Sequence, residues 1–147
     1  MNSIVKTLQA AMLDHQAGRI EAAKSAYKDI LALEPTNVDA THLLGIAILQ
    51  LGDAQAAIEQ LSAAVDLRPD NSTFHFNLGV AQAKAVMTED AIDSYQTALN
   101  LNPRNSGAAN NLAVLLGADG DLEGAETVLR KILTLNTHDL SAAVNLA

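Results

Sequence analysis

A repeat of 34 residues constrains this chain more than any other feature of its sequence. Pro35, Pro69 and Pro103 lie 34 residues apart, and the next step of the period falls on Thr137. The segments around these four positions share a leucine and an overall pattern, namely LALEPTN, VDLRPDN, LNLNPRN and LTLNTHD. A fixed period of this size is typical of proteins built from stacked structural units. We therefore expect a stack of repeats rather than a domain with one central core.

Each repeat is predicted to hold two helices joined by a tight turn. In its second half, an alanine is followed four residues later by a large apolar residue, which is helical spacing. These pairs are Ala23 and Tyr27, Ala57 and Leu61, Ala91 and Tyr95, and Ala125 and Leu129. Gly18, Gly52 and Gly120 fall midway and suit the left-handed conformation that ends many helices. Val86 takes this place in the third repeat, and because a β-branched residue resists that conformation, we expect a distorted or differently closed turn there.

The first helix of each repeat is predicted to begin after a residue that caps helix starts well. Short polar side chains accept hydrogen bonds from the free N–H groups there. One repeat position carries them throughout: Ser3, Asn37, Asn71, Asn105 and Asp139. The first helices then cover about residues 4–17, 38–51, 72–85 and 106–119. The prolines, two residues before the three asparagines, close the preceding helix.

A pair of positions inside the first helices ends in a small residue in every repeat. The pairs are Ala10 and Ala11, Leu44 and Gly45, Leu78 and Gly79, and Leu112 and Ala113. Small residues there allow two helices to approach closely.

Together these features resemble the tetratricopeptide repeat, a 34-residue helix-turn-helix unit with an LG pair, an alanine, a bulky residue and a proline. The resemblance covers essentially the whole chain, as repeats at about 4–37, 38–71, 72–105 and 106–139 and a partial fifth at 140–147. It departs from the family at Gln82, where a tyrosine is common, and at the usual tryptophan position, which holds Thr7, Thr41, His75 and Ala109. The resemblance implies an all-α fold, a right-handed α-solenoid that forms a single array.

Charge and composition argue against several classes of function. The net charge is −8 and the 9 lysines and arginines are scattered, so we expect no nucleic-acid partner. The chain has no cysteine, which excludes a disulfide framework and thiolate metal sites. It has no apolar stretch long enough to span a membrane and no signal peptide, so we expect no membrane partner and a cytoplasmic location.

No catalytic group, cofactor or metal site is predicted within this chain. The four histidines, His15, His42, His75 and His138, fall at different repeat positions, without cysteine or a glycine-rich phosphate loop. His42 and His75 lie in adjacent first helices, but two ligands without a matching carboxylate make a poor metal site. No pair of carboxylates is placed for general acid and base catalysis.

The first helices carry few charges, whereas the second helices and loops are acidic. The charged residues of the first helices are Lys6, Asp14, Asp39, Lys84 and Asp119. The family resemblance implies that first helices line a concave groove, which is then nearly neutral here. We interpret the acidic outer face as a solvated surface rather than a binding site.

Asparagine recurs in this predicted groove, at Asn77, Asn111 and Asn145. A side-chain amide carries both a donor and an acceptor, so it can pair with a peptide group of any sequence. The arrangement resembles the asparagine ladder with which the tetratricopeptide arm of O-linked N-acetylglucosamine transferases grips extended polypeptides. Gln9 and Leu43 take the same position in the first two repeats, which confines the ladder to the C-terminal half. The alternative is that asparagine is merely tolerated at a polar, half-exposed position.

Other first-helix residues complete the predicted peptide-binding groove. They are Phe76, Asn110, Lys84, Gln50 and His42, with Gln16 as a further polar contact. Phe76 is the strongest candidate anchor because aromatic side chains dominate binding hot spots. A clamp for a partner's terminal carboxylate, as in some co-chaperones of the family, is not expected. Its positions hold no basic residue here, namely Leu8, Met12, Leu43, Thr73 and Asn77.

These patterns predict a scaffold that binds a protein or an extended peptide. The second hypothesis is a substrate-recruiting arm of a larger glycosyltransferase or other transferase, because the opening resembles bacterial repeat arrays that precede such domains. The third is a self-assembly scaffold. The sequence stops within a predicted helix, so we expect a fragment of a longer chain, with self-association through an uncovered apolar face around Leu129, Ile132 and Leu133.

Overall fold

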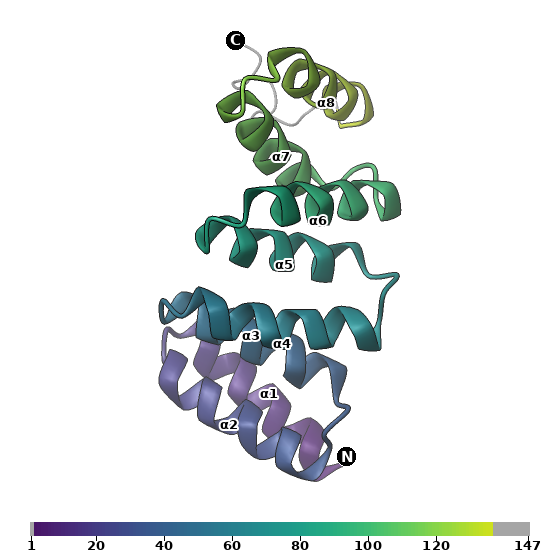
Figure 1. The fold of residues 1–147 in the computed structure, drawn as a ribbon. Helices are drawn as coiled ribbons and strands as arrows, with labels where there is room; N and C mark the ends of the chain where they lie inside the picture. The colour runs from purple at the N-terminus through teal and green to yellow at the C-terminus, as the bar shows by residue number, and fades with distance from the viewer. Residues whose placement is uncertain (1, 137–147) are drawn as a thin grey trace. The chain divides into compact units, whose positions relative to one another are not determined.

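The computed structural model describes residues 2–136 of the 147-residue chain, and this part consists of eight α-helices without a β-strand (Figure 1). The helices are α1 (Ser3–Gln16), α2 (Ile20–Leu33), α3 (Val38–Gln50), α4 (Ala54–Leu67), α5 (Ser72–Lys84), α6 (Thr88–Leu101), α7 (Ser106–Ala118) and α8 (Leu122–Leu135). The predicted all-α solenoid class and the two helices per repeat are confirmed. None of the described helices is long and apolar enough to cross a lipid bilayer.

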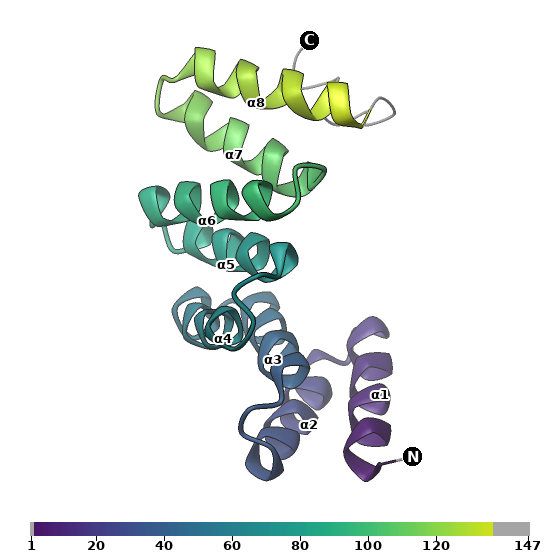
Figure 2. The same cartoon turned by 90° about the vertical axis from the view of Figure 1, so that its right-hand side faces the viewer.

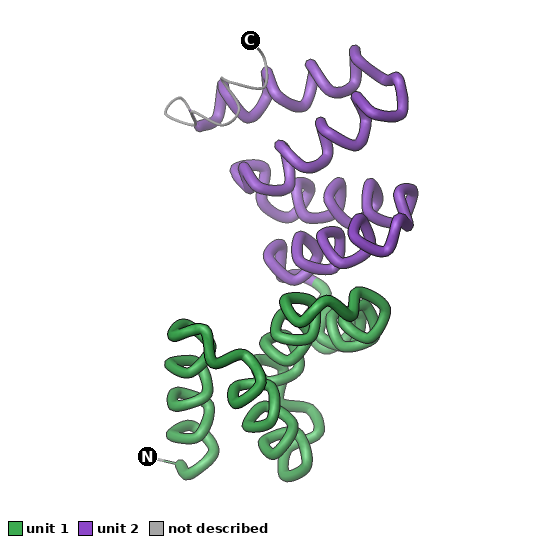
Figure 3. The backbone as a smooth tube through the Cα atoms, turned by 90° about the vertical axis from the view of Figure 1, so that its left-hand side faces the viewer, with its two compact units in different colours: residues 1–69 green, residues 70–147 purple. Residues whose placement is uncertain are grey.

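The helices group into two compact units, which Figure 3 shows in different colours. Unit 1 is Met1–Pro69 and contains α1 to α4, and unit 2 is Asp70–Ala147 and contains α5 to α8. Within unit 1, α2 contacts both α1 and α3, and α3 pairs with α4. Within unit 2, α6 lies between α5 and α7, and α7 pairs with α8 (Figure 2). Each unit thus comprises two helix pairs stacked in chain order.

The recurring alanine and bulky residue of the second helices form the interior of each pair. Tyr27, Leu61 and Tyr95 are at most 2% exposed, and the alanines four residues before them are fully buried. In the last pair, Leu129 is 5% exposed while Ala125 is only half-buried. Burying side chains of this size supplies most of the stabilisation of a helix pair.

Two glycines bring the helices of the middle pairs close together. A Cβ atom added at Gly45 would lie 2.7 Å from Cγ of Leu61, and one added at Gly79 would lie 2.7 Å from Cε1 of Tyr95. Real Cβ contacts are essentially never this short, so any larger residue at Gly45 or Gly79 would force Leu61 or Tyr95 to shift. In the outer pairs the same position holds Ala11 and Ala113, both buried, whereas Ala10 is exposed.

The turn inside each pair closes in the same way in all four repeats. Gly18, Gly52 and Gly120 have φ angles of 81°, 99° and 89°. In the first turn, the Gly18 N–H donates to the His15 carbonyl at 3.1 Å and the Arg19 N–H donates to the Asp14 carbonyl at 2.9 Å. These two hydrogen bonds satisfy backbone carbonyls that would otherwise be free at the end of the helix.

The expectation of a distorted turn at Val86 was wrong. Val86 has a φ of 61°, and its N–H donates to Ala83 at 3.1 Å while the N–H of Met87 donates to Gln82 at 2.9 Å. The hydrogen bonds are those of the glycine turns, so the valine accepts a disfavoured conformation because the closed turn satisfies the end of α5. Its side chain is 82% exposed, so packing against other residues does not alter the turn.

The predicted helix starts are confirmed at three asparagines. The side chains of Asn37, Asn71 and Asn105 accept hydrogen bonds from the N–H groups three residues later, at 3.0 to 3.1 Å. The prediction for Ser3 was wrong, because Asn2 caps α1 instead and accepts from the Ile4 N–H at 2.9 Å. Asparagine one residue earlier satisfies the same free N–H groups, which displaces the cap by one position. Asp139 lies outside the described residues.

The C-terminal end of unit 2 differs from the expectation of an uncovered apolar face. Leu129 and Ile132 are 5% and 1% exposed and pack in one cluster with Ala109 and Ala113 of α7, while Leu133 is half-buried. The premise of an exposed surface at Leu129 and Ile132 was therefore wrong, because α8 turns these side chains toward α7. Self-association itself stays a prediction.

Candidate functional site

Each unit has a pocket at the same place in its repeats, on the side of the first helices. The pocket in unit 1, here called the His15 pocket, is lined by Met12, His15, Gln16, Tyr27, Leu43 and Gln50. The pocket in unit 2, here called the Asn111 pocket, is lined by Val80, Ala83, Lys84, Tyr95, Asn111, Val114 and Leu115. Their volumes are about 390 and 300 Å³. Five residues of the His15 pocket lie two repeats before five residues of the Asn111 pocket, at equivalent repeat positions. Tyr27 and Tyr95 are one of these five pairs.

The His15 pocket is held together by hydrogen bonds from all three of its helices. The imidazole of His15 on α1 lies with Nδ1 3.0 Å from the Tyr27 hydroxyl on α2 and with Nε2 2.5 Å from the Gln50 side-chain carbonyl on α3. The His15 and Tyr27 rings also stack obliquely, with centroids 5.8 Å apart. Met12 and Leu43 give the pocket an apolar wall. This wall and the exposed amides of Gln16 and Gln50 could receive an uncharged peptide segment.

The Asn111 pocket combines an amide, a cation and an apolar wall. The Nδ2 of Asn111 on α7 donates to the hydroxyl of Tyr95 on α6 at 3.3 Å, which fixes the direction of the amide. Lys84 is exposed at the end of α5, and Val114 on α7 is 61% exposed beside the pocket. The second N–H and the carbonyl of Asn111 remain available, since its one hydrogen bond within the described residues uses a single N–H.

Both tyrosine hydroxyls at the base of these pockets stay protonated at neutral pH. Burial raises the pKa of Tyr27, and the nearby charge of Asp14 raises it further. Burial also raises the pKa of Tyr95, while the hydrogen bond from Asn111 partly opposes this rise. A protonated phenol both donates and accepts, so each hydroxyl can orient a polar neighbour without adding charge.

The structure brings some of the predicted groove residues together and places others elsewhere. Lys84 and Asn111 share the Asn111 pocket, and Gln50 joins the His15 pocket. Phe76 is half-buried with its ring centroid 6.0 Å from that of Tyr95, and its tip packs closely over Gly107. Part of the proposed anchor is thus used in packing between α5, α6 and α7. His42 is 8% exposed, which leaves little of its ring for a ligand.

The remaining predicted groove residues are the asparagines. Asn77 on α5 and Asn110 on α7 are half-buried, and each already has a contact within the protein. Asn145 lies outside the described residues. Among residues 2–136, no group of three or more histidines, aspartates or glutamates lies close enough to hold a metal ion.

His15, Tyr27 and Tyr95 were not predicted from the sequence as site residues. The tyrosines were interpreted only as large apolar residues, in a series that runs Tyr27, Leu61, Tyr95 and Leu129. The alternation of tyrosine with leucine was the available signal, because a buried phenol needs a hydrogen-bond partner whereas leucine does not. That need is met by His15 in one unit and by Asn111 in the other.

Comparisons with solved structures find close matches over nearly the whole chain. MamA matches with a TM-score of 0.84 and 25% identity, over 99% of this chain and 81% of MamA. MamA from Desulfovibrio magneticus RS-1 matches with a TM-score of 0.86 and 21% identity, over 93% and 78%. YrrB, described as a tetratricopeptide repeat protein with an unusual peptide-binding site, matches with a TM-score of 0.83 and 20% identity, over 97% and 73%. No curated protein matches the chain in sequence.

Two family models match the sequence, and both describe the tetratricopeptide repeat. One covers residues 14–78 and the other covers residues 94–127, which together make about two thirds of the 147 residues. Both matches include residues of the pockets, among them Tyr27 in the first and Tyr95 in the second. The repeat period, the eight described helices and these matches agree, and the chain belongs to the tetratricopeptide repeat family.

Proposed function

We propose that this protein is an interaction scaffold that binds an extended polypeptide segment along the first helices of unit 2. The observation that carries the proposal is the Asn111 amide, which Tyr95 holds in one direction at 3.3 Å while a donor and the acceptor stay unused. An amide fixed in this way has lost its rotational freedom before binding, so less entropy is lost when a peptide pairs with it.

The surroundings of Asn111 suit a peptide rather than a compact charged ligand. Val80, Val114 and Leu115 form an apolar wall that can receive one side chain of the peptide. Lys84 is the single basic residue of the pocket, and a carboxylate side chain of the ligand can pair with it. The pocket therefore favours a segment with an apolar residue close to an acidic one.

The second asparagine of unit 2 extends the site along α5. Asn77 and Asn111 occupy the same position in consecutive first helices, which pack roughly 10 Å apart in such stacks. An extended peptide advances about 3.3 Å per residue, so the two amides would meet peptide groups about three residues apart. The fold is compatible with this function, since YrrB shares it and has an unusual peptide-binding site.

The test begins with peptides selected on the purified chain from a random 12-residue display library. The affinity of a selected peptide is then compared between the wild type and the double variant Asn77→Ala/Asn111→Ala. Loss of two hydrogen bonds, each contributing about 0.5 to 1.5 kcal/mol, should weaken binding about tenfold or more. Gln55→Ala removes an exposed amide from the second helix α4 and should leave the affinity unchanged.

Equal affinity of the wild type and the double variant would overturn backbone pairing by the asparagines. Failure to select any peptide would overturn the peptide-binding function itself. The self-assembly hypothesis stays untested, although Leu129 and Ile132, two of the three residues named for self-association, are buried.

A further inference from the structure

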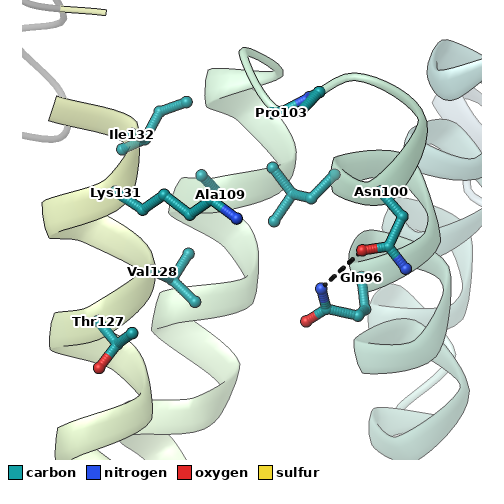
Figure 4. A pocket seen from close by; sticks show the side chains of 9 residues that line it. Gln96, Asn100, Pro103, Ala109, Thr127, Val128, Lys131 and Ile132 are labelled. Atoms are coloured by element: carbon teal, nitrogen blue, oxygen red, sulfur yellow. Dashed lines mark hydrogen bonds between the residues drawn. The ribbon is translucent and has the colours of Figure 1, made fainter. Parts of the chain in front are cut away.

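A third pocket lies in unit 2, between the second helices α6 and α8 and against α7 (Figure 4). Its volume is about 220 Å³. The base is aliphatic and includes Leu99 of α6, Ala109 of α7 and Val128 of α8. None of the residues that line the Asn111 pocket lines this pocket, so its function can be tested independently of the one proposed above.

The base of the pocket includes a small residue where other repeats carry larger ones. Ala109 is the smallest of the four residues at its repeat position, where the other repeats carry Thr7, Thr41 and His75. In unit 1, Thr41 fills this position and is 4% exposed. Ala109 itself is fully buried, so the aliphatic surface that a ligand can reach is provided by the half-buried side chains of Leu99 and Val128.

The rim of this pocket is rich in hydrogen-bond donors. Figure 4 shows Lys131 extending from α8 across the hollow, opposite Gln96 and Asn100 on α6. The Nε2 of Gln96 donates to Oδ1 of Asn100 at 3.3 Å, so both N–H groups of Asn100 and one of Gln96 remain available. Lys131 is exposed and has no ion pair or hydrogen bond among residues 2–136. Its neighbour Arg130, in contrast, is paired with Glu126 at 2.6 Å.

We propose that this outer pocket binds the carboxy-terminal residue of a partner polypeptide when that residue is aliphatic. A terminal leucine, isoleucine or valine presents both an apolar side chain for the base and a carboxylate for Lys131 and the Asn100 amide. The pocket is smaller than the roughly 300 to 1,000 Å³ that encloses a typical small-molecule ligand. Gln96, Asn100 and Lys131 are also exposed at the rim, so a longer chain can continue away from the pocket into solvent.

The test uses the 15N-labelled full chain and the synthetic pentapeptide Gly-Ser-Gly-Ser-Leu with a free carboxylate. A contact of this size predicts a dissociation constant on the order of 1 mM, which nuclear magnetic resonance titration can measure. The amide signals of Ala109, Val128 and Ile132 should shift on addition of the peptide. The same peptide with a C-terminal amide should bind about three- to fivefold more weakly, because it lacks the ion pair with Lys131. A peptide ending in glycine should bind more than tenfold more weakly, because it buries no apolar side chain.

Two substitutions separate this pocket from a general effect of charge. Lys131→Gln should weaken binding of the free-carboxylate peptide about three- to fivefold and abolish the difference from the amidated peptide. Lys28→Gln makes the same change at an exposed position on α2 and should leave both affinities unchanged. Circular dichroism checks that both variants keep the helical content of the wild type.

The proposal would be overturned by equal binding of the carboxylate and amide forms, or by the absence of shifts at 10 mM peptide. It would also be overturned if Asn77→Ala/Asn111→Ala, rather than Lys131→Gln, weakened binding of the pentapeptide. The last result would assign the pentapeptide to the first-helix face and leave the function proposed for that face intact.

Discussion

Val86 holds a backbone conformation that costs a β-branched residue free energy. Its φ of 61° is the conformation that glycine provides in the other three turns, and the side chain gains little packing because it is 82% exposed. A left-handed conformation costs most residues about 1 to 2 kcal/mol. We therefore predict that Val86→Gly raises the free energy of unfolding by about 1 kcal/mol, measured by urea denaturation, after the entropy cost of glycine is subtracted.

The reverse change provides the control for Val86. Gly52 has a φ of 99° in the equivalent turn of unit 1, and a Cβ added there would meet no atom within 4 Å. Gly52→Val should lower the free energy of unfolding by about 1 kcal/mol, because the smaller entropy of the unfolded valine chain again offsets part of the cost of the left-handed conformation. A Val86→Gly variant that is less stable than the wild type would contradict the account of this turn.

His42 should make stability depend on pH between about 4 and 6.5. Burial lowers its pKa from 6.5 to about 4, although the charge of Asp39 partly opposes this shift. As the pH falls through 6.5, the unfolded chain therefore gains a proton that the folded chain does not, and stability is lost. Between pH 7 and pH 5 this should remove about 1 to 2 kcal/mol of unfolding free energy.

The variant His42→Leu isolates this contribution, because leucine stands at the same position in the first repeat as Leu8. Urea denaturation at pH 7 and pH 5 should show a smaller loss of stability in the variant than in the wild type. Equal losses in the two proteins would show that His42 does not contribute to the pH dependence.

At the scale of the helix, α5 packs closely on α6 because Gly79 has no side chain. A Cβ there would lie 2.7 Å from Cε1 of Tyr95, whose ring is 2% exposed and has little room to move. Alanine favours a helix over glycine by about 1 kcal/mol, but overpacking an interior costs about 1 to 3 kcal/mol. We predict that Gly79→Ala lowers the free energy of unfolding by about 1 kcal/mol overall.

Gly117 on α7 is the matched control for this prediction. It lies in the last turn of α7, and a Cβ added there would meet nothing within 4 Å. Gly117→Ala should therefore raise the free energy of unfolding, by less than the roughly 1 kcal/mol that helix propensity contributes in a helix interior. If both variants gained stability, the packing of α5 on α6 would be looser than the structure shows.

For the molecule as a whole, the period in the sequence was sufficient to predict the helices. The expected first helices at 38–51 and 72–85 correspond to Val38–Gln50 and Ser72–Lys84. The prediction succeeded because capping and turn residues recur at fixed positions in every repeat. The prediction was wrong at Val86, because the hydrogen bonds of the closed turn outweigh the preference of valine for a negative φ. It also misplaced the cap of α1, where two adjacent polar residues, Asn2 and Ser3, compete.

The pockets could not be predicted in the same way. The Asn111 pocket depends on where the Tyr95 hydroxyl points once the ring is buried, and the outer pocket depends on side-chain volumes contributed by three helices. Both are properties of packing between elements rather than of any one repeat. Lys84 and Asn111, which were both named from the sequence as groove residues, do line one pocket, but their role in binding stays a prediction.

The central claim is that the first helices of unit 2 bind an extended peptide, and mapping the binding site of a selected peptide tests it most directly. The 15N-labelled chain would be titrated with the peptide and the shifted amide signals assigned to residues. The account predicts that the largest shifts lie on α5 and α7, around Asn77, Lys84, Asn111 and Val114. Shifts confined to the second helices α6 and α8, with these four residues unaffected, would contradict it.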